Sequence, residues 1–292
     1  MAKTCLKALR RQGPLKTCLL RSWTSSCKTS STDETMTKPQ PLFFIKIHVD
    51  LHWGFASRRT VLSKSKDSFL IPPPTTFIGA LAYGHAKLFN GPEELDSVSY
   101  AEKVRENLVS VNVKVNTPLQ EYSDLSRIWW YRGRERAVKF DAVALGKVVK
   151  GISELPSFTV TYLFNDDGIR GLGGEKAIIT SALSMIRVSS KESIASVKKL
   201  EYGPAWPLEG EKAITSYSFW YDLVDEIKGD YYAQRVVDYK RASIGDYFKA
   251  PERMHVYPYD IKRRCTTNVE IKVRDGRALI YDVGGEKVVI EL

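Results

Sequence analysis

The stretch FFIKIHVDLHW, residues 43–53, decides how the first part of this 292-residue chain folds. Apolar and polar side chains alternate along it without a break, which is typical of a β-strand with one buried face. The pattern therefore predicts a half-buried strand with an unusually functional polar face. The apolar face holds Ile45, Ile47, Val49 and Leu51, and the polar face holds Lys46, His48, Asp50 and His52.

The two histidines of this strand can be interpreted in several ways. His48 and His52 share a face but lie roughly 13 Å apart at about 3.3 Å per residue, so they cannot hold one metal ion. Asp50 is nearer to His48, at roughly 6.6 Å between Cα atoms. Three interpretations stay open: a sheet face that is solvated or covered, a contact with RNA phosphate or ribose, and a general acid or base for RNA cleavage.

Composition excludes several classes of protein. The apolar fraction of 43% and the charged fraction of 27% are those of an ordinary globular chain. No apolar run approaches the 18 or so residues of a membrane-spanning helix. The four cysteines include no CxxC pair, and no Cys or His pair has zinc-finger spacing. We therefore expect no disulfide scaffold, no membrane span, no metal and no cofactor.

The net charge of +10 and the pI near 9.3 favour a polyanionic partner. Residues 1–35 carry seven basic and two acidic side chains, whereas the remaining 257 residues carry 37 and 32. The body of the chain is thus only mildly basic, and a nucleic-acid surface has to come from local clustering. Four Gln and six Asn beside many Lys, Arg and Glu are typical of a thermophile.

Residues 1–35 differ from the rest of the chain. They are rich in Arg and Ser and almost free of acid, as in a mitochondrial transit peptide. A second interpretation, which we favour, is that Met36 is the true start and that the preceding residues are upstream sequence translated in frame. We expect the segment to be unstructured. A mitochondrial RNA-binding protein is a distant hypothesis that rests on this segment alone.

Local patterns predict further elements along the body. The three prolines at 72–74 predict a helix that starts at a capping Thr75 or Thr76 and reaches Leu88. Asn165 and Gly168 mark a turn. Helices are expected at residues 97–108 and 177–183, and strands at 109–115, 157–164, 184–188 and 194–200. Turns at Asp275-Gly276 and Gly284-Gly285 predict a C-terminal meander of the strands VEIKV, ALIYDV and KVVIEL.

The segment RIWWYRGRER, residues 127–136, is the densest basic and aromatic cluster. Guanidinium groups pair with phosphates, and flat rings stack on unpaired bases, so the cluster predicts a single-stranded RNA site. The alternative is that the tryptophans are packed while the arginines are solvated. The candidate residues are Arg127, Trp129, Trp130, Tyr131, Arg132, Arg134, Arg136 and Lys139.

The segment GIRGLGGEK, residues 168–176, places backbone N–H groups before a helix, where they could cradle an anion. It matches neither the Walker A loop nor the GxGxxG pattern, and a plain connection is the alternative. Two more cations, Arg187 and Lys191, follow closely in the sequence.

Two motifs resemble the Cas-five family, the RAMP-superfamily subunits that cap the five-prime handle of the guide RNA in CRISPR Cascade complexes. They are SFLIPPPTTFIGALAYG at residues 68–84 and MIRVSSKESIASV at residues 185–197. Ser189 replaces the usual glycine of the second motif. The resemblance runs from about Lys38 to the C-terminus and is most similar to archaeal type I-A members.

The resemblance implies an α+β fold in three parts. These are an extension at 1–35, a ferredoxin-like (RRM-like) RAMP domain at 36–202 with an inserted β-hairpin or thumb at about 116–150, and a smaller β-rich part at 203–292. It implies a cytoplasmic complex with crRNA, the large subunit and a backbone subunit, and leaves contact with target DNA near the PAM open. It extends RNA binding to Gly171, Gly173, Gly174, Lys176, Arg187 and Lys191. The basic loop after the first strand adds Arg58 and Arg59 as candidates for RNA binding.

One branch of the family cleaves precursor guide RNA without metal, using Tyr, Lys and His. Such cleavage needs a base beside the ribose 2′-hydroxyl and an acid at the leaving oxygen. His48, His52 and Lys46 could supply these groups, although that branch's triad does not match positions here. We expect a non-catalytic subunit, with a metal-independent endoribonuclease as the alternative.

Overall fold

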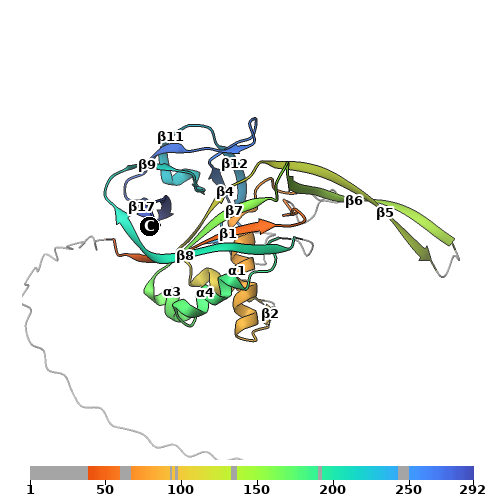
Figure 1. Cartoon of the computed structure of the whole chain (residues 1–292), viewed down its shortest axis with the longest axis horizontal. Helices are drawn as coiled ribbons and strands as arrows, with labels where there is room; N and C mark the ends of the chain where they lie inside the picture. Colours follow the sequence, from red (N-terminus) through yellow and green to blue (C-terminus); the bar gives the residue numbers. More distant parts are fainter. Residues whose placement is uncertain are drawn as a thin grey trace, which may run out of the picture. The chain divides into compact units, whose positions relative to one another are not determined.

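The computed structural model describes residues 39–59, 67–92, 94–95, 98–132, 137–189, 193–242 and 250–292. Residues Pro39–Leu292 form one compact unit, whose elements are labelled in Figure 1. The expectation about residues 1–35 lies outside the described residues.

A six-stranded antiparallel sheet in the order β18-β17-β8-β1-β7-β4 forms the centre of this unit. The predicted first strand is confirmed as β1, which lies between β7 and β8. Strands far apart in the sequence are therefore side by side. The six are β1 (Leu42–Leu51), β4 (Ser110–Val115), β7 (Ser157–Phe164), β8 (Ala195–Leu208), β17 (Ala278–Asp282) and β18 (Lys287–Glu291).

Helices α1 (Pro74–Leu88), α3 (Asp166–Gly171) and α4 (Glu175–Leu183) lie together on one side of β1 and β8 in Figure 1. Helix α1 begins where the prolines end, because Pro73 is extended and Pro74, at the first helical position, needs no N–H partner. The prediction that Thr75 or Thr76 caps this helix is wrong: both lie inside its first turn.

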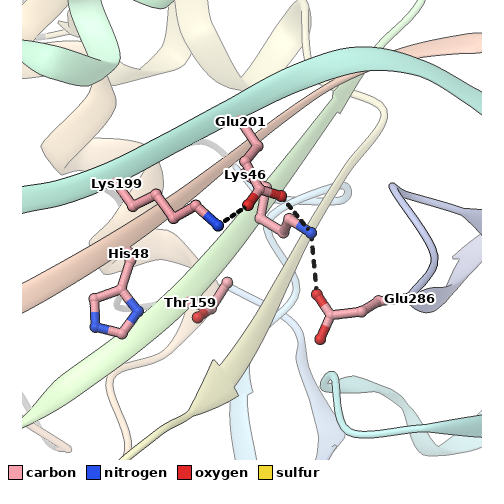
Figure 2. Close-up of a pocket in the computed structure, with 6 residues that line it drawn as sticks. All are labelled: Lys46, His48, Thr159, Lys199, Glu201 and Glu286. Atoms are coloured by element: carbon pink, nitrogen blue, oxygen red, sulfur yellow. Dashed lines mark hydrogen bonds and ion pairs between the residues drawn. The ribbon is translucent and has the colours of Figure 1, made fainter.

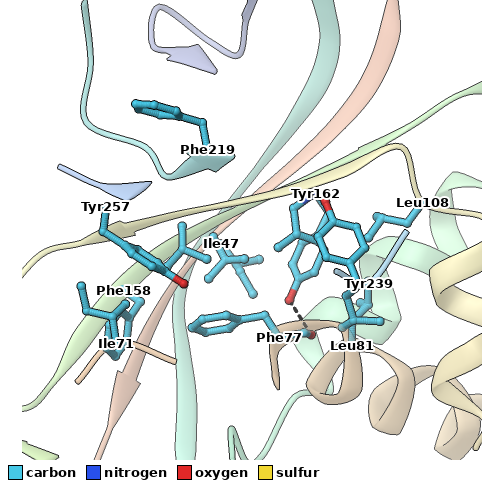
Figure 3. Close-up of a cluster of buried hydrophobic side chains, with 14 of the residues drawn as sticks. Ile47, Ile71, Phe77, Leu81, Leu108, Phe158, Tyr162, Phe219, Tyr239 and Tyr257 are labelled. Carbon is cyan, nitrogen blue, oxygen red and sulfur yellow. Dashed lines mark hydrogen bonds between the residues drawn. The ribbon is translucent and has the colours of Figure 1, made fainter. Parts of the chain in front are cut away.

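The main core fills the space between the helices and the apolar face of β1. Figure 3 shows Ile47 beside Phe77 and Leu81 of α1 and beside Phe158 and Tyr162 of β7. These five side chains are at most 1% exposed. The Tyr162 hydroxyl donates to the backbone oxygen of Phe77 at 2.9 Å, so the one polar atom of that ring has a partner.

The helix predicted at 97–108 is shorter than expected. Helix α2 covers only Ala101–Glu106, because Val98–Ser99 forms the short strand β3 paired with β2 (Glu94–Leu95). The Ser99 hydroxyl accepts the N–H of Ala101 at 3.3 Å and so supports the start of α2. A local pairing therefore replaces the first turn of the predicted helix.

Two other local predictions are wrong. The turn expected at residues 165–168 is the start of α3, where the Asn165 side chain accepts the N–H of Gly168 at 2.8 Å. Residues 184–188 form no strand, and only an isolated bridge joins Arg187 to Ile194. Ser184 instead ends α4, with its N–H bonded back to Thr180 at 3.0 Å.

Strands β5 (Leu119–Arg132) and β6 (Ala137–Gly151) pair with each other and follow β4 in the chain. The pairing shifts register between Asp124 and Leu125. Such an irregularity interrupts the two-residue alternation of a strand. This explains why residues 116–150 fit neither a strand nor a helix period when the sequence is read alone.

The C-terminal strands form further small sheets. The predicted meander is wrong in one respect: VEIKV is a strand, but it pairs with β9 and β11 instead of ALIYDV. These sheets are β11-β16-β9, β10-β13-β12 and β14-β15. Their strands are β9 (Lys212–Thr215), β10 (Phe219–Trp220), β11 (Val224–Lys228), β12 (Tyr232–Val237), β13 (Glu252–Tyr257), β14 (Tyr259–Asp260), β15 (Cys265–Thr266) and β16 (Val269–Val273), with a 3₁₀ turn at Tyr221–Leu223.

An ion cluster around Arg253 joins three of these segments to β18. Its guanidinium donates to both carboxylate oxygens of Asp222 at 2.7 Å, to Asp238 at 3.2 Å and to Glu291 at 2.9 Å. The Asp238 side chain is fully buried. Two residues along β13, His255 is also buried, and its ring packs against Trp220 with centroids 4.5 Å apart.

The polar face of β1 is covered at one end. A second apolar cluster packs Phe44 of β1 and Leu163 of β7 against Tyr217 and the strands β17 and β18. Exposure then rises along the strand: Phe44 and Lys46 are buried, His48 and Asp50 are intermediate, and His52 is exposed. The interpretation of this face as covered therefore holds only for its first half, at Phe44 and Lys46.

Candidate functional site

A hollow of about 180 Å³ lies on the polar face of β1, where the cover ends. Four adjacent segments line it, as Figure 2 shows: β1, β7, β8 and the turn between β17 and β18. In the strand register, His48 lies opposite both Thr159 and Lys199, and Lys46 lies opposite Glu201. The lining residues are Lys46, His48, Thr159, Lys199, Glu201 and Glu286.

Lys46 is the buried centre of the hollow. Its Nζ lies 2.8 Å from Glu201, 3.1 Å from Glu286 and 3.3 Å from the backbone oxygen of Val283. Burial alone would lower the pKa of Lys46, but the hydrogen bonds that its ammonium donates to the two carboxylates, together with their negative charges, outweigh burial and raise the pKa. Because an ammonium has three protons, all of them are engaged, and Lys46 has none left for a ligand.

Glu286 joins the C-terminal turn to the central sheet. Besides Lys46, its carboxylate accepts from Lys114 of β4 at 2.7 Å and from the Tyr217 hydroxyl at 2.8 Å. Burial would raise the pKa of Glu286, but these three donors together lower the pKa to about 2. Burial and the nearby Glu286 charge raise the pKa of Tyr217, so this phenol stays a neutral donor.

Lys199 extends the charge network to the surface. Its ammonium forms an ion pair with Glu201, while 72% of its side chain is exposed. The hydrogen bonds from Lys199 and then from Lys46 lower the pKa of Glu201. Since Lys46 already neutralises part of this carboxylate, the exposed ammonium of Lys199 is available to an incoming anion.

His48 is the most versatile group in the hollow. The Asn116 amide donates to Nδ1 at 3.3 Å, which places the ring proton on Nε2, 2.8 Å from the Ser157 hydroxyl and 3.5 Å from Asp50. Its side chain is 39% exposed. An oriented, partly exposed imidazole of this kind can hydrogen-bond a phosphate or a ribose hydroxyl.

The structure does not bring His48 and His52 to a common partner. His48 bonds Ser157 of β7, whereas the His52 ring lies 2.9 Å from the Ser196 hydroxyl of β8. The two imidazoles therefore lean toward opposite neighbours of β1. Lys46, the third residue of the predicted catalytic set, is buried in its ion pairs.

The basic loop after β1 lies against other segments of the chain. The Arg59 guanidinium is 5.6 Å above the Phe69 ring, and Arg58 forms a backbone bridge with Ser68. Both arginines are exposed, so RNA contact here stays a prediction.

The predicted basic and aromatic cluster lies on β5 and β6. The backbone register places Trp129 opposite Phe140 and Trp130 opposite Lys139, while Arg127 and Arg132 lie opposite Ala142 and Ala137. Gly133, Arg134 and Arg136 fall outside the described residues. The RNA-binding role of this cluster stays a prediction.

The glycine-rich segment connects α3 and α4. Gly173 and Gly174 have φ angles of +83° and +96°, which glycine adopts without strain. Their N–H groups bond back to Arg170 and Ile169 at the end of α3. A Cβ on Gly171 would come within 2.0 Å of Asn107. Chain geometry thus explains these glycines, and anion binding here, with exposed Lys176 beside it, stays a prediction.

The second motif meets α1 and the loop after β1. The Arg187 guanidinium lies 4.7 Å above the Tyr83 ring, and Lys87 lies 5.4 Å from the same ring. Ser189, where the family has glycine, has φ +79°. Its hydroxyl donates to the backbone oxygen of Ala56 at 2.6 Å and lies 2.8 Å from the Ser57 hydroxyl. Lys191 falls outside the described residues.

Sequence reasoning missed four residues of the hollow: Thr159, Lys199, Glu201 and Glu286. For Thr159, Lys199 and Glu201 the available signal was strand alternation, which identifies a face but not its neighbours. Glu286 follows a Gly-Gly turn, and no local pattern relates it to Lys46. In the described ranges, no group of three or more His, Cys, Asp or Glu is arranged to hold a metal, and no helix is long and apolar enough to cross a membrane.

No model of a known protein family matches the chain. Two curated proteins of Saccharolobus solfataricus are similar to it. CRISPR system aCascade subunit Cas5 1 is 26% identical over 257 residues, and CRISPR-associated protein Cas5 3 is 25% identical over 255. Each match covers 85% of this chain and 99% of the relative. The predicted resemblance to the Cas-five family is confirmed.

A crystal structure of a CRISPR protein from Archaeoglobus fulgidus has the same fold, with a TM-score of 0.58 and 24% sequence identity. The match covers 86% of this chain and 99% of that one. A mixed α and β architecture is therefore shared over almost the whole compact unit.

Proposed function

We propose that this chain, which resembles Cas5 proteins over 85% of its length, is the non-catalytic subunit that binds the guide RNA in a type I CRISPR effector. In this role it caps the five-prime handle of crRNA and joins the large subunit to the backbone subunits, in defence against foreign DNA. The match to an aCascade subunit over 99% of that subunit's length carries the proposal.

The order of the central strands supports a ferredoxin-like RAMP domain. Helices lie between β1 and β4 and between β7 and β8 along the chain, and the four strands lie in the sheet order β8-β1-β7-β4, as in the β-α-β-β-α-β or split β-α-β unit. Strands β5 and β6 are inserted between β4 and β7, where the family's thumb is expected. Strand β8 continues across residue 203, so the proposed C-terminal part shares a strand with the RAMP domain.

The hollow supports binding in preference to cleavage. Metal-free cleavage needs one group that accepts a proton from the 2′-hydroxyl and another that donates to the leaving oxygen. Lys46 has all three protons engaged, and the Tyr217 hydroxyl is committed to Glu286. The endoribonuclease stays the alternative because His48 is oriented, partly exposed and 3.5 Å from Asp50.

One experiment separates the two functions. Protein spanning residues 36–292 is incubated with labelled repeat RNA in EDTA, and binding and strand integrity are read on the same gel. The proposal predicts a shifted, intact RNA. If the RNA is cut at one position, and His48→Ala abolishes this cleavage, the endoribonuclease replaces the proposed binding function. If the protein does not bind the RNA, the proposed function is refuted.

The basic cluster is tested in the same assay with a charge-matched control. Arg132→Ala with Arg134→Ala should weaken binding and lower the slope of log K against log salt by about 0.7 for each lost phosphate contact. Arg235→Ala with Arg277→Ala removes the same charge from two other exposed positions and should have little effect. Equal losses of RNA affinity in the two double variants would mean that the net charge of the protein alone binds the RNA.

A further inference from the structure

Trp53 is a large aromatic residue that neither the sequence analysis nor the hollow uses. It is the second residue after the end of β1, and 69% of its surface is exposed. We propose that its indole is a stacking platform for one unpaired base of the RNA. This inference rests on the proposed function and assigns a base-binding position to the turn that follows β1.

The turn that carries Trp53 is fixed on both sides. The N–H of His52 donates to Ile194 at 2.9 Å. Phe55 and Val149 exchange two backbone hydrogen bonds, of 2.9 and 2.8 Å. Gly54, which lies between His52 and Phe55 in the chain, has a φ angle of +78°, which allows the chain to turn sharply.

The buried side chain of Phe55 also anchors this turn to the core. Its ring is 1% exposed and packs edge-on against Phe158, with centroids 5.7 Å apart. The indole is therefore presented to solvent from a backbone that is already ordered. Little conformational entropy would be lost when a ligand packs on it, which favours binding.

The surrounding charge favours a nucleic acid. Residues 48–59 contain Arg58 and Arg59 against one acid, Asp50, together with two histidines. Across the sheet, β8 adds the exposed side chains of Lys198 and Lys199. An exposed aromatic ring in a segment that also carries the exposed Arg58 and Arg59 fits a base and its phosphates, and stacking needs a base that is not in a duplex.

The position of the turn joins the two regions proposed to bind RNA. Val149 belongs to β6, so Trp53 lies at the base of the β5–β6 hairpin. On its other side, β1 leads from His52 to His48 in the hollow. An RNA strand bound along the hairpin would reach Trp53 before the polar face of the sheet.

The test compares two exposed tryptophans. Trp206 of β8 is 56% exposed, so Trp206→Ala removes a similar surface indole from another strand. Binding of labelled repeat RNA to residues 36–292 is measured by fluorescence anisotropy. Trp53→Ala should weaken it about 5- to 150-fold, Trp53→Phe much less, and Trp206→Ala should leave it unchanged.

A series of repeat RNAs, each with one abasic position, makes the test specific. One abasic position should weaken binding to the unchanged protein yet have no further effect on Trp53→Ala, because the stacking partner is already gone. An unchanged urea midpoint shows that Trp53→Ala is folded.

The possible failures are distinguishable. If the unchanged protein does not bind repeat RNA, the proposed function is wrong and the inference falls with it. If it binds and Trp53→Ala binds equally well, only the stacking site is refuted. Loss of a protein partner from Trp53→Ala without loss of RNA affinity would likewise overturn the inference and make Trp53 a protein contact.

Discussion

Replacing Glu286 by Gln removes the carboxylate that joins the C-terminal turn to the central sheet, with little change in shape. In the folded chain this carboxylate accepts from Lys46, Lys114 and Tyr217, and its pKa falls from the ordinary 4.5 to about 2. A shift of that size corresponds to about 3 kcal/mol of unfolding free energy at neutral pH. Because 34% of the side chain is exposed, solvent screening reduces the expected loss to about 2 kcal/mol.

The stabilisation by Glu286 depends on pH in a direction that the lowered pKa determines. The folded-state pKa is depressed, so the contribution is complete above pH 4.5 and is lost as the pH falls from 4.5 toward 2. Urea unfolding of the unchanged protein and Glu286→Gln at pH 7, 5, 4 and 3 measures the difference. We expect the gap to be largest at pH 7 and 5 and to narrow below pH 4.5.

A matched control isolates the contacts from the charge. Glu209→Gln removes the same charge from an exposed position and should change the unfolding free energy by less than about 0.5 kcal/mol. The stabilising role of the ion cluster is refuted if Glu286→Gln is as stable as Glu209→Gln at pH 7. It is also refuted if the loss of unfolding free energy in Glu286→Gln is the same at pH 3 as at pH 7. In either case the ion cluster does not hold the turn in place.

Three further predictions concern stability. Ser189→Ala should lower the free energy of unfolding by about 1–2 kcal/mol, because it loses two hydrogen bonds and keeps a positive φ angle. Ser189→Gly should be close to neutral, because glycine relieves the strain of that φ angle. Urea unfolding midpoints measure both changes. Arg253→Met should cost about 3–5 kcal/mol, seen as a lower melting temperature, because Asp238 stays buried without its main counter-ion. Burial and then Arg253 lower the pKa of His255 to about 3, so stability should rise with pH between about 3 and 6.5, and His255→Phe should flatten that slope in urea titrations.

Each of these has a result that contradicts it. Equal stabilities of the Ala and Gly variants at position 189 would show that backbone strain there is negligible. An unchanged melting temperature for Arg253→Met would mean that the remaining partners of Asp238, Arg241 and the Lys240 N–H, are enough to hold its charge. An identical pH slope for His255→Phe would assign the acid sensitivity to other groups.

Local patterns determined several features of this chain. The two-residue period of residues 43–53 predicted β1 and its two faces, because alternation follows from the pleat of a single strand. The glycine turn at 284–285 predicted the boundary between β17 and β18, since positive φ angles are a local requirement. The motifs at 68–84 and 185–197 indicated a resemblance to Cas5 proteins, and the two similar curated proteins confirmed that resemblance.

Only the tertiary structure decided what covers the polar face of β1. Glu286 lies 240 residues after Lys46 in the sequence, yet its carboxylate accepts a hydrogen bond from the Lys46 ammonium. The partners of β16 and the engagement of Tyr217 depend in the same way on contacts between distant segments. The sequence by itself could place His48 on a polar face. The surroundings of that face, which bury Lys46 and leave His48 and Trp53 accessible, depend on how distant strands pack, and no local pattern records that packing.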